Sequence, residues 1–114
     1  IRGTLTASGL QGVTIEISGA LVDEVRGASV ITSPLIGDFN AENLVLALGT
    51  LLSWNVPVDE ACEALSRCQP PPGRMEMLGG AADQPTVVVD YAHTPAGLER
   101  ALFNLRSLTG ADLW

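Results

Sequence analysis

An aspartate and a histidine stand close together at the end of a short apolar run. Residues 86–89 read Thr-Val-Val-Val, which is typical of a strand buried on both faces, and Asp90 follows directly, with His93 three residues later. Ligands of open α/β sheets bind at the carboxyl ends of the strands. We therefore expect Asp90 and His93 to lie at a binding site, where a carboxylate can accept hydrogen bonds from hydroxyl groups.

Two amides and an arginine are further candidates for ligand binding. Asn40 and Asn43 lie one helical turn apart, and an amide carries both a donor and an acceptor, so it can bind a purine edge. Arg74 follows a proline run and a glycine, and a planar guanidinium suits phosphate oxygens. Structural interpretations stay open beside these: Asn40 as a helix cap, Arg74 as an ion-paired surface residue, Asp90 as the cap of the next turn. The single histidine, His93, can equally be structural.

The first half of the chain predicts strands followed by helices. Apolar and polar residues alternate over residues 13–17, which predicts a strand, and residues 5–7 and 28–33 predict two more in an antiparallel β region. From Asn40 the apolar period becomes helical, with Asn40 as the expected N-cap. Residues 58–68 predict a second helix that forms an antiparallel hairpin with the first.

A proline run separates the two halves. Residues 69–73 read Gln-Pro-Pro-Pro-Gly, and three prolines remove three backbone donors, so this segment neither continues a helix nor joins a central strand. We place a domain boundary there, between residues 1–72 and 73–114. After it we expect a short strand, then the strand at 86–89, and a helix that Thr94 caps and Pro95 begins.

The expected fold class is α/β. It comprises a β-rich first part, a helical hairpin, the linker and one βα unit of a Rossmann-like domain. The core face expected for the last helix consists of Leu98, Ala101, Leu102, Leu105 and Leu108.

The composition excludes several classes of partner. The chain has 114 residues, a net charge of −7 and no lysine, so nucleic acid and anionic membranes are poor partners. No apolar run is long enough for a membrane span, and no signal peptide opens the chain, so we expect a cytoplasmic protein. Cys62 and Cys68 lack the spacing of a zinc site, and one histidine cannot supply one, so we expect no bound metal and two reduced thiols.

Three motifs in order resemble the Mur ligases. They are Gly-Asp-Phe-Asn-Ala-Glu-Asn at 37–43, Pro-Gly-Arg-Met-Glu at 72–76 and Pro-Thr-Val-Val-Val-Asp-Tyr-Ala-His-Thr-Pro at 85–95. The resemblance runs from about residue 34 to residue 106. It is strongest to the members that add the third amino acid to the peptidoglycan stem peptide.

The resemblance implies a substrate and a role for each candidate residue. Members of this family use ATP and Mg²⁺ to join an amino acid to UDP-MurNAc-dipeptide through an acyl phosphate. By resemblance, Asn40 and Asn43 lie beside the adenine, Arg74 reaches the phosphates from a hinge, Asp90 contacts the ribose and His93 lies near the nucleotide. Residues 1–72 would then be the last part of the central ATP-binding domain, and residues 73–114 the start of the C-terminal domain.

The chain also departs from the family pattern. No Gly-rich phosphate loop occurs, and the catalytic residues, the magnesium ligands and the motif that selects the amino acid lie outside this sequence. Gly97 stands where relatives commonly place an acidic residue near the helix start. We therefore expect a fragment that is inactive alone, and the sequence leaves open whether diaminopimelate or lysine is added. The alternatives are a non-catalytic fragment that self-associates into a homo-oligomer, or a fragment of a folylpolyglutamate synthetase-like ligase.

Overall fold

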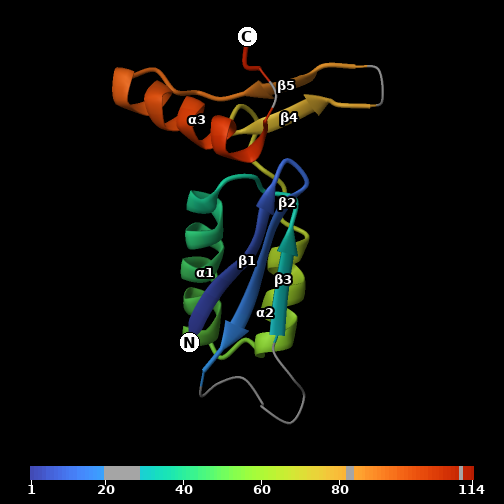
Figure 1. Cartoon of the computed structure of the whole chain (residues 1–114). Helices are drawn as coiled ribbons and strands as arrows, with labels where there is room; N and C mark the ends of the chain where they lie inside the picture. Colours follow the sequence, from blue (N-terminus) through green and yellow to red (C-terminus); the bar gives the residue numbers. More distant parts are fainter. Residues whose placement is uncertain (20–28, 82–83, 111) are drawn as a thin grey trace. The chain divides into compact units, whose positions relative to one another are not determined.

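The computed structural model describes residues 1–19, 29–81, 84–110 and 112–114. The chain divides into two units, residues 1–69 and residues 70–114, and the division falls at the proline run. Figure 1 shows the order of elements along the chain, which mixes strands and helices in both units. The predicted α/β class is thus confirmed. The assignment of the two parts to particular Mur ligase domains stays a prediction.

Three antiparallel strands form the sheet of residues 1–69. They are β1 (Arg2–Gly9), β2 (Gly12–Ser18) and β3 (Ser29–Ser33), in the order β1-β2-β3. Ile15 of the central strand pairs with Leu5 on one side and with Ile31 on the other. The predicted alternation is confirmed, because Val13, Ile15 and Ile17 are buried while Glu16 is exposed.

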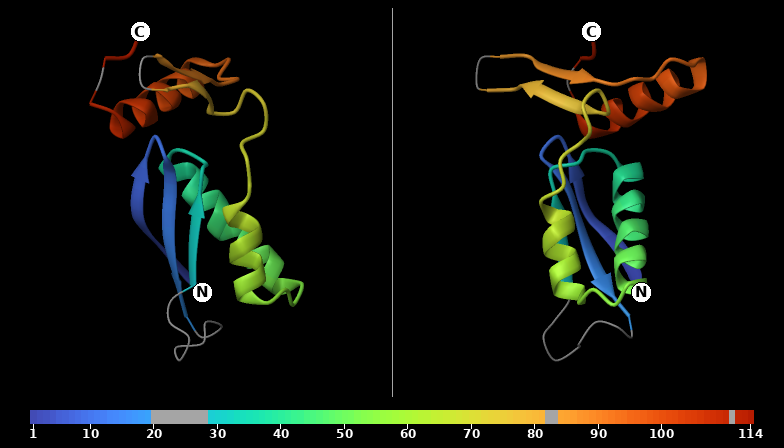
Figure 2. Two further views of the ribbon diagram at one scale, coloured as in Figure 1. Left: turned by 90° about the vertical axis from the view of Figure 1, so that its right-hand side faces the viewer. Right: turned by 180° about the vertical axis from the view of Figure 1, so that it is seen from behind.

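Two helices cover one face of this sheet (Figure 2). They are α1 (Asp38–Ser53) and α2 (Val58–Ser66), which run in opposite directions as the predicted hairpin requires (Figure 1). Their apolar stripes meet the buried face of the sheet and complete one core. Its buried members are Val13, Ile15, Ile17, Ile31, Ala41, Leu44, Leu48, Ala61, Cys62 and Leu65.

Residues 70–114 hold a second, smaller sheet. Strands β4 (Glu76–Gly79) and β5 (Thr86–Val89) pair antiparallel, with Met77 opposite Val88, and helix α3 (Pro95–Leu108) follows. The prediction that 86–89 is buried on both faces is wrong here, because Val87 is 49% exposed and Val89 39% exposed. The faces of a strand are covered by layers packed on the sheet, and in the described part of residues 70–114 the one helix, α3, leaves both strands largely open.

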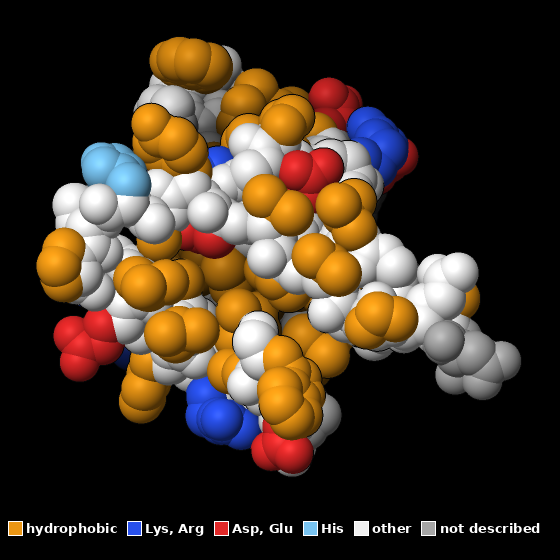
Figure 3. All heavy atoms as spheres, turned by 90° about the horizontal axis from the view of Figure 1, so that it is seen from above, with side chains coloured by type: hydrophobic (Ala, Val, Ile, Leu, Met, Phe, Trp, Pro, Cys, Tyr) orange, Lys and Arg blue, Asp and Glu red, His pale blue; other side chains and the backbone are white. Residues whose placement is uncertain are grey.

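The predicted core face of α3 is also left open. The helix has no buried residue, and Leu98 and Leu102 are about half exposed. The apolar spacing was read correctly as a helix, but a two-stranded sheet offers little surface to bury the stripe. Figure 3 shows hydrophobic side chains, in orange, at many points of the molecular surface.

In the described part of the chain, no helix is both long enough and apolar enough to cross a membrane.

Helix α1 allows a matched test of the core. Leu48 is fully buried, whereas Leu46, two residues earlier on the same helix, is 72% exposed. Leu48→Ala should lower the free energy of unfolding by about 2–5 kcal/mol, because it leaves a cavity. Leu46→Ala should change it by no more than about 0.5 kcal/mol. Urea unfolding followed by circular dichroism measures both, and equal losses would contradict the described core.

The two cysteines should differ in reactivity. Burial, and secondarily the charge of Asp59, raises the pKa of the Cys62 thiol, so less of the reactive thiolate exists at a given pH. Cys68 is only partly buried. Cys68→Ala, which keeps Cys62, should react slowly with a disulfide reagent at about pH 7 and faster toward about pH 9. Cys62→Ala, which keeps Cys68, should react faster throughout, and concentrated guanidinium should abolish the difference. Equal rates in the folded variants would refute this.

Candidate functional site

A tight bend carries Arg74 out of the proline run. We call residues 71–76 the Arg74 turn. Gly73 and Met75 both adopt left-handed backbone conformations, with φ of 70° and 48°. The Arg74 N–H donates to the Pro71 carbonyl at 3.1 Å, and the Gly73 N–H donates to Glu76 Oε2 at 2.8 Å. These bonds close the turn on itself.

Asp90 ties the Arg74 turn to the end of β5. Its Oδ2 accepts from the Met75 N–H at 3.0 Å, and its Oδ1 accepts from the Ala92 N–H at 2.9 Å. The structural interpretation of Asp90 as a turn cap is therefore correct, and it extends to a second segment 15 residues away. A carboxylate has about four lone-pair positions, so each oxygen can accept one more hydrogen bond. Ribose binding by Asp90 stays a prediction.

Arg74, Tyr91 and His93 form one exposed group beside Asp90. The Arg74 guanidinium carbon lies 5.2 Å from the centroid of the Tyr91 ring. The Tyr91 and His93 rings lie 5.0 Å apart at an interplanar angle of 51°. His93 Nδ1 lies 3.0 Å from the Tyr91 carbonyl oxygen, which can only accept, so Nδ1 is the protonated nitrogen and Nε2 is free to accept when the ring is neutral.

Tyr91 is the member of this group that sequence reasoning did not single out. The available signal was an aromatic residue directly after a strand-end aspartate. In the structure the Tyr91 side chain is 63% exposed, so it is not part of a hydrophobic core. We call Arg74, Asp90, Tyr91 and His93 the strand-end cluster.

The start of α3 is capped as predicted, and Gly97 lies against the cap. Thr94 Oγ1 accepts from the Gly97 N–H at 3.1 Å, and Pro95 is the first helical residue, as predicted. A Cβ at position 97 would lie only 3.0 Å from Thr94 Oγ1. A glycine at 97 therefore accommodates this cap without displacing it.

Asn40 and Asn43 lie in the other unit, on the first turns of α1. The prediction that Asn40 caps the helix is wrong. The N-cap is Gly37, and Asn40 lies inside the helix with its Nδ2 donating to the Ile36 carbonyl at 2.8 Å. Asn43 Nδ2 donates to Asn40 Oδ1 at 3.4 Å. Because Gly37 has a φ of 90°, the chain bends there and enters the helix three residues earlier than a cap at Asn40 would require.

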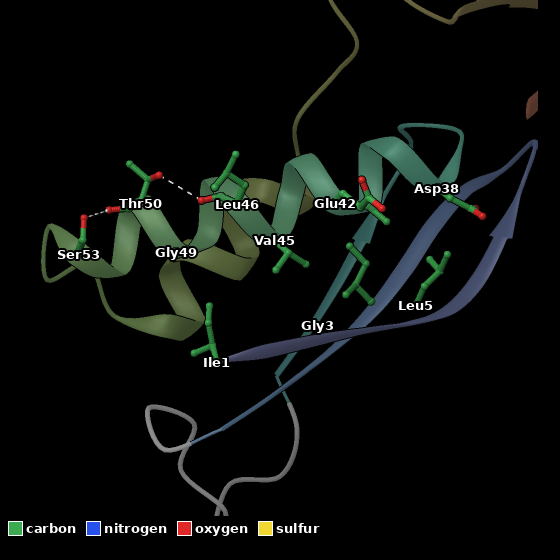
Figure 4. A pocket seen from close by; sticks show the side chains of 12 residues that line it. Ile1, Gly3, Leu5, Asp38, Glu42, Val45, Leu46, Gly49, Thr50 and Ser53 are labelled. Carbon is green, nitrogen blue, oxygen red and sulfur yellow. Dashed lines mark hydrogen bonds between the residues drawn. The ribbon is translucent and has the colours of Figure 1, made fainter. Parts of the chain in front are cut away.

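A separate groove of about 860 Å³ lies between β1 and α1 (Figure 4). Its walls are largely apolar, with Val45 of α1 pointing toward Gly3 of β1 and the carboxylates of Asp38 and Glu42 toward the end where Leu5 lies. Asn40 and Asn43 do not line it. Two acidic side chains would repel the phosphates of a nucleotide, so we do not assign the predicted nucleotide to this groove.

Three of the five predicted site residues are thus brought together within one unit, and the other two belong to the other unit. Arg74, Asp90 and His93 share the strand-end cluster within residues 70–114. Asn40 and Asn43 are adjacent to each other within residues 1–69. Within the described ranges, no group of three or more histidine, cysteine or acidic side chains could hold a metal ion.

The Asp90 bridge can be tested by removing one charge. Asp90→Asn leaves one carbonyl oxygen for two backbone donors, so one N–H loses its acceptor at a cost of about 1.5–3 kcal/mol. Amide hydrogen exchange at Met75 or Ala92 should accelerate by about tenfold or more. Glu99→Gln on α3 is the control, because it removes the same charge from an exposed side chain. Unchanged exchange in Asp90→Asn would show that the carboxylate does not hold these amides.

Comparison with known proteins places this geometry in a family. Residues 73–114, which contain the strand-end cluster, match the Mur ligase glutamate ligase domain. The UDP-N-acetylmuramoyl-L-alanyl-D-glutamate–2,6-diaminopimelate ligase of Ralstonia nicotianae is 41% identical over 117 residues, covering 100% of this chain and 22% of that protein. The enzyme of the same name from Pseudomonas aeruginosa is 46% identical over 97 residues, covering 85% and 20%.

Solved structures agree with the sequence matches. A structure of a UDP-N-acetylmuramoyl-L-alanyl-D-glutamate–2,6-diaminopimelate ligase superposes with a TM-score of 0.70 at 31% identity, over 97% of this chain and 21% of that one. MurF from Acinetobacter baumannii shares the fold, with a TM-score of 0.74 at 19% identity, over 94% and 23%. The chain spans about a fifth of the length of the curated relatives it matches. On its sequence and its fold, the chain belongs to the Mur ligase family.

Proposed function

We propose that this chain supplies part of the nucleotide clamp of an ATP-dependent ligase of peptidoglycan precursor synthesis. The whole enzyme would join 2,6-diaminopimelate to UDP-N-acetylmuramoyl-L-alanyl-D-glutamate, the substrates that the relatives' names print. The observation that carries the proposal is the strand-end cluster, which gathers a cation, a carboxylate and two aromatic rings at the end of β5.

Arg74 is suited to bind the phosphates of ATP. Among the described residues, no carboxylate pairs with its guanidinium, so the donors of the side chain are not consumed by an ion pair. A guanidinium can then donate two parallel, charge-assisted hydrogen bonds to phosphate oxygens.

The other predicted contacts rest on remaining hydrogen-bond capacity. Asp90 keeps lone pairs that can accept from ribose hydroxyls beside its two backbone bonds. The Asn40 and Asn43 amides retain donors and an acceptor for an adenine edge. His93 Nε2 is available near the same place. We assign no residue to Mg²⁺, since the described residues offer no cluster of ligands for it.

In the proposed reaction, a substrate carboxylate oxygen attacks the γ-phosphorus of ATP and ADP leaves. The amine of the incoming amino acid then attacks the acyl carbon, phosphate leaves, and the nitrogen loses a proton. Such phosphoryl transfer is accelerated mostly by positioning and by stabilisation of charge. The residues of this chain would contribute binding and orientation of ATP to the first step.

A chimera tests the proposal. The segment of the Ralstonia nicotianae enzyme that aligns with this chain would be replaced by residues 1–114, and ATP-dependent addition of diaminopimelate would be measured. We expect ligation by the chimera and none by the free 114-residue chain. Arg74→Ala in the chimera should lower kcat/KM for ATP by about 100-fold or more, the usual cost of losing a donor to transition-state charge.

Arg67→Ala is the matched control for Arg74→Ala. Arg67 is also exposed, but it lies at the end of α2, where it pairs with Glu63. This variant should leave kcat/KM for ATP nearly unchanged. A folded chimera that binds ATP and ligates equally well with and without Arg74 would overturn the assignment, and a cooperative thermal transition would establish that it is folded.

A further inference from the structure

The Arg74 guanidinium contacts an aromatic ring. A surface arginine more often pairs with a carboxylate. The guanidinium carbon of Arg74 lies 5.2 Å from the Tyr91 ring centroid. Over the ranges that the structure describes, no carboxylate forms an ion pair with this guanidinium. The attraction between a cation and a ring is electrostatic and uses the face of the ring.

This kind of contact leaves the hydrogen-bond donors of Arg74 free. A guanidinium has five N–H donors. A carboxylate partner would occupy two of them and neutralise the charge. The ring restrains the side chain without either effect, so Arg74 remains able to bind an anion.

The backbones of the two partners are linked by a hydrogen bond between their neighbours, next to the Glu76–Val89 pair of the β4–β5 ladder. Met75 follows Arg74, Asp90 precedes Tyr91, and the Met75 N–H donates to the Asp90 carboxylate at 3.0 Å. The Tyr91 carbonyl also accepts from His93 Nδ1, and the His93 ring lies against the tyrosine ring. These contacts bring the backbones of Arg74 and Tyr91 and the tyrosine ring to one place.

We propose that Tyr91 is a positioning residue whose ring holds the Arg74 guanidinium ready to bind the polyphosphate of a nucleotide. The ring is the acting part, because the tyrosine hydroxyl makes no hydrogen bond within the described part of the chain and the side chain is 63% exposed. The identity of the anion rests on the proposed function, whereas the ring contact does not.

The ring contact is tested on the whole 114-residue chain by nuclear magnetic resonance. Tyr91→Phe keeps the ring, and Tyr91→Leu removes it with little loss of volume. The Arg74 Nε–H should be restrained in the unsubstituted chain and in Tyr91→Phe. In Tyr91→Leu its mobility should rise to that of Arg100, an exposed arginine on α3. Amide exchange at Met75 and Ala92 should be the same in all three proteins, which shows that the turn is intact.

Binding of inorganic pyrophosphate, read from the Arg74 Nε–H shift, tests the positioning role. Tyr91→Leu should weaken it by about two- to fivefold, the range of exposed cation–π contacts, and Tyr91→Phe should not. An equally restrained Arg74 in Tyr91→Leu, or equal affinities in all three proteins, would overturn the proposal. If mobility and affinity change as expected while the chimera forms no product, the proposed function fails and the positioning role stands.

Discussion

The Asp90 carboxylate is the constraint on which the arrangement of residues 70–114 depends. A left-handed backbone at a residue with a side chain, such as Met75, costs about 1–3 kcal/mol. A hydrogen bond from a backbone N–H to a charged group contributes about 1.5–3 kcal/mol. The Met75–Asp90 bond is therefore strong enough to offset the local strain. With the turn held in this form, the Arg74 guanidinium lies beside the ring of Tyr91.

The two units differ in how they are stabilised. Residues 1–69 bury a continuous apolar core between one sheet face and two helices, which is the layer arrangement that stabilises small domains. Residues 70–114 have no such layer, since the stripe of α3 is open and β5 is mostly exposed. Their order depends more on directed hydrogen bonds, from the Thr94 cap to the Asp90 bridge. Changes of single polar atoms should therefore matter more there than in the first unit.

Much of the fold could be read from the sequence because each element has a clear period. The alternation at Val13–Ile17 and the helical spacing after it gave the strands and the helix pair, and Thr94-Pro95 gave the start of α3. Burial was harder to predict, since an apolar run shows what could be covered and not what covers it. The same limit applies to Asn40. Its type suits a cap, but the conformation of Gly37 decides where the helix begins.

The site was predictable in its residue types and not in its contacts. Sequence spacing placed Asp90 and His93 at a strand end, and the structure adds Arg74 to them. No sequence pattern indicated that the N–H of Met75, 15 positions earlier, donates to the Asp90 carboxylate. Such a contact depends on how the chain reverses its direction between the two residues. Tyr91 was missed for a related reason. An exposed aromatic has no periodic signature, and its role appears only when its neighbour across the turn is known.

The acceptors that hold the Arg74 turn bind main-chain groups. Asp90 and Glu76 receive the N–H groups of Met75 and Gly73, which every residue except proline provides. The two acids thus place no demand on the side chains at these positions, although the buried side chain of Met75 and the left-handed conformation of both residues still restrict them. Homologous linkers can therefore differ in sequence and still follow the same path, provided that the two acids are kept. Covariation between the acids and the absence of proline would then mark this turn in relatives better than the identity of the other linker residues.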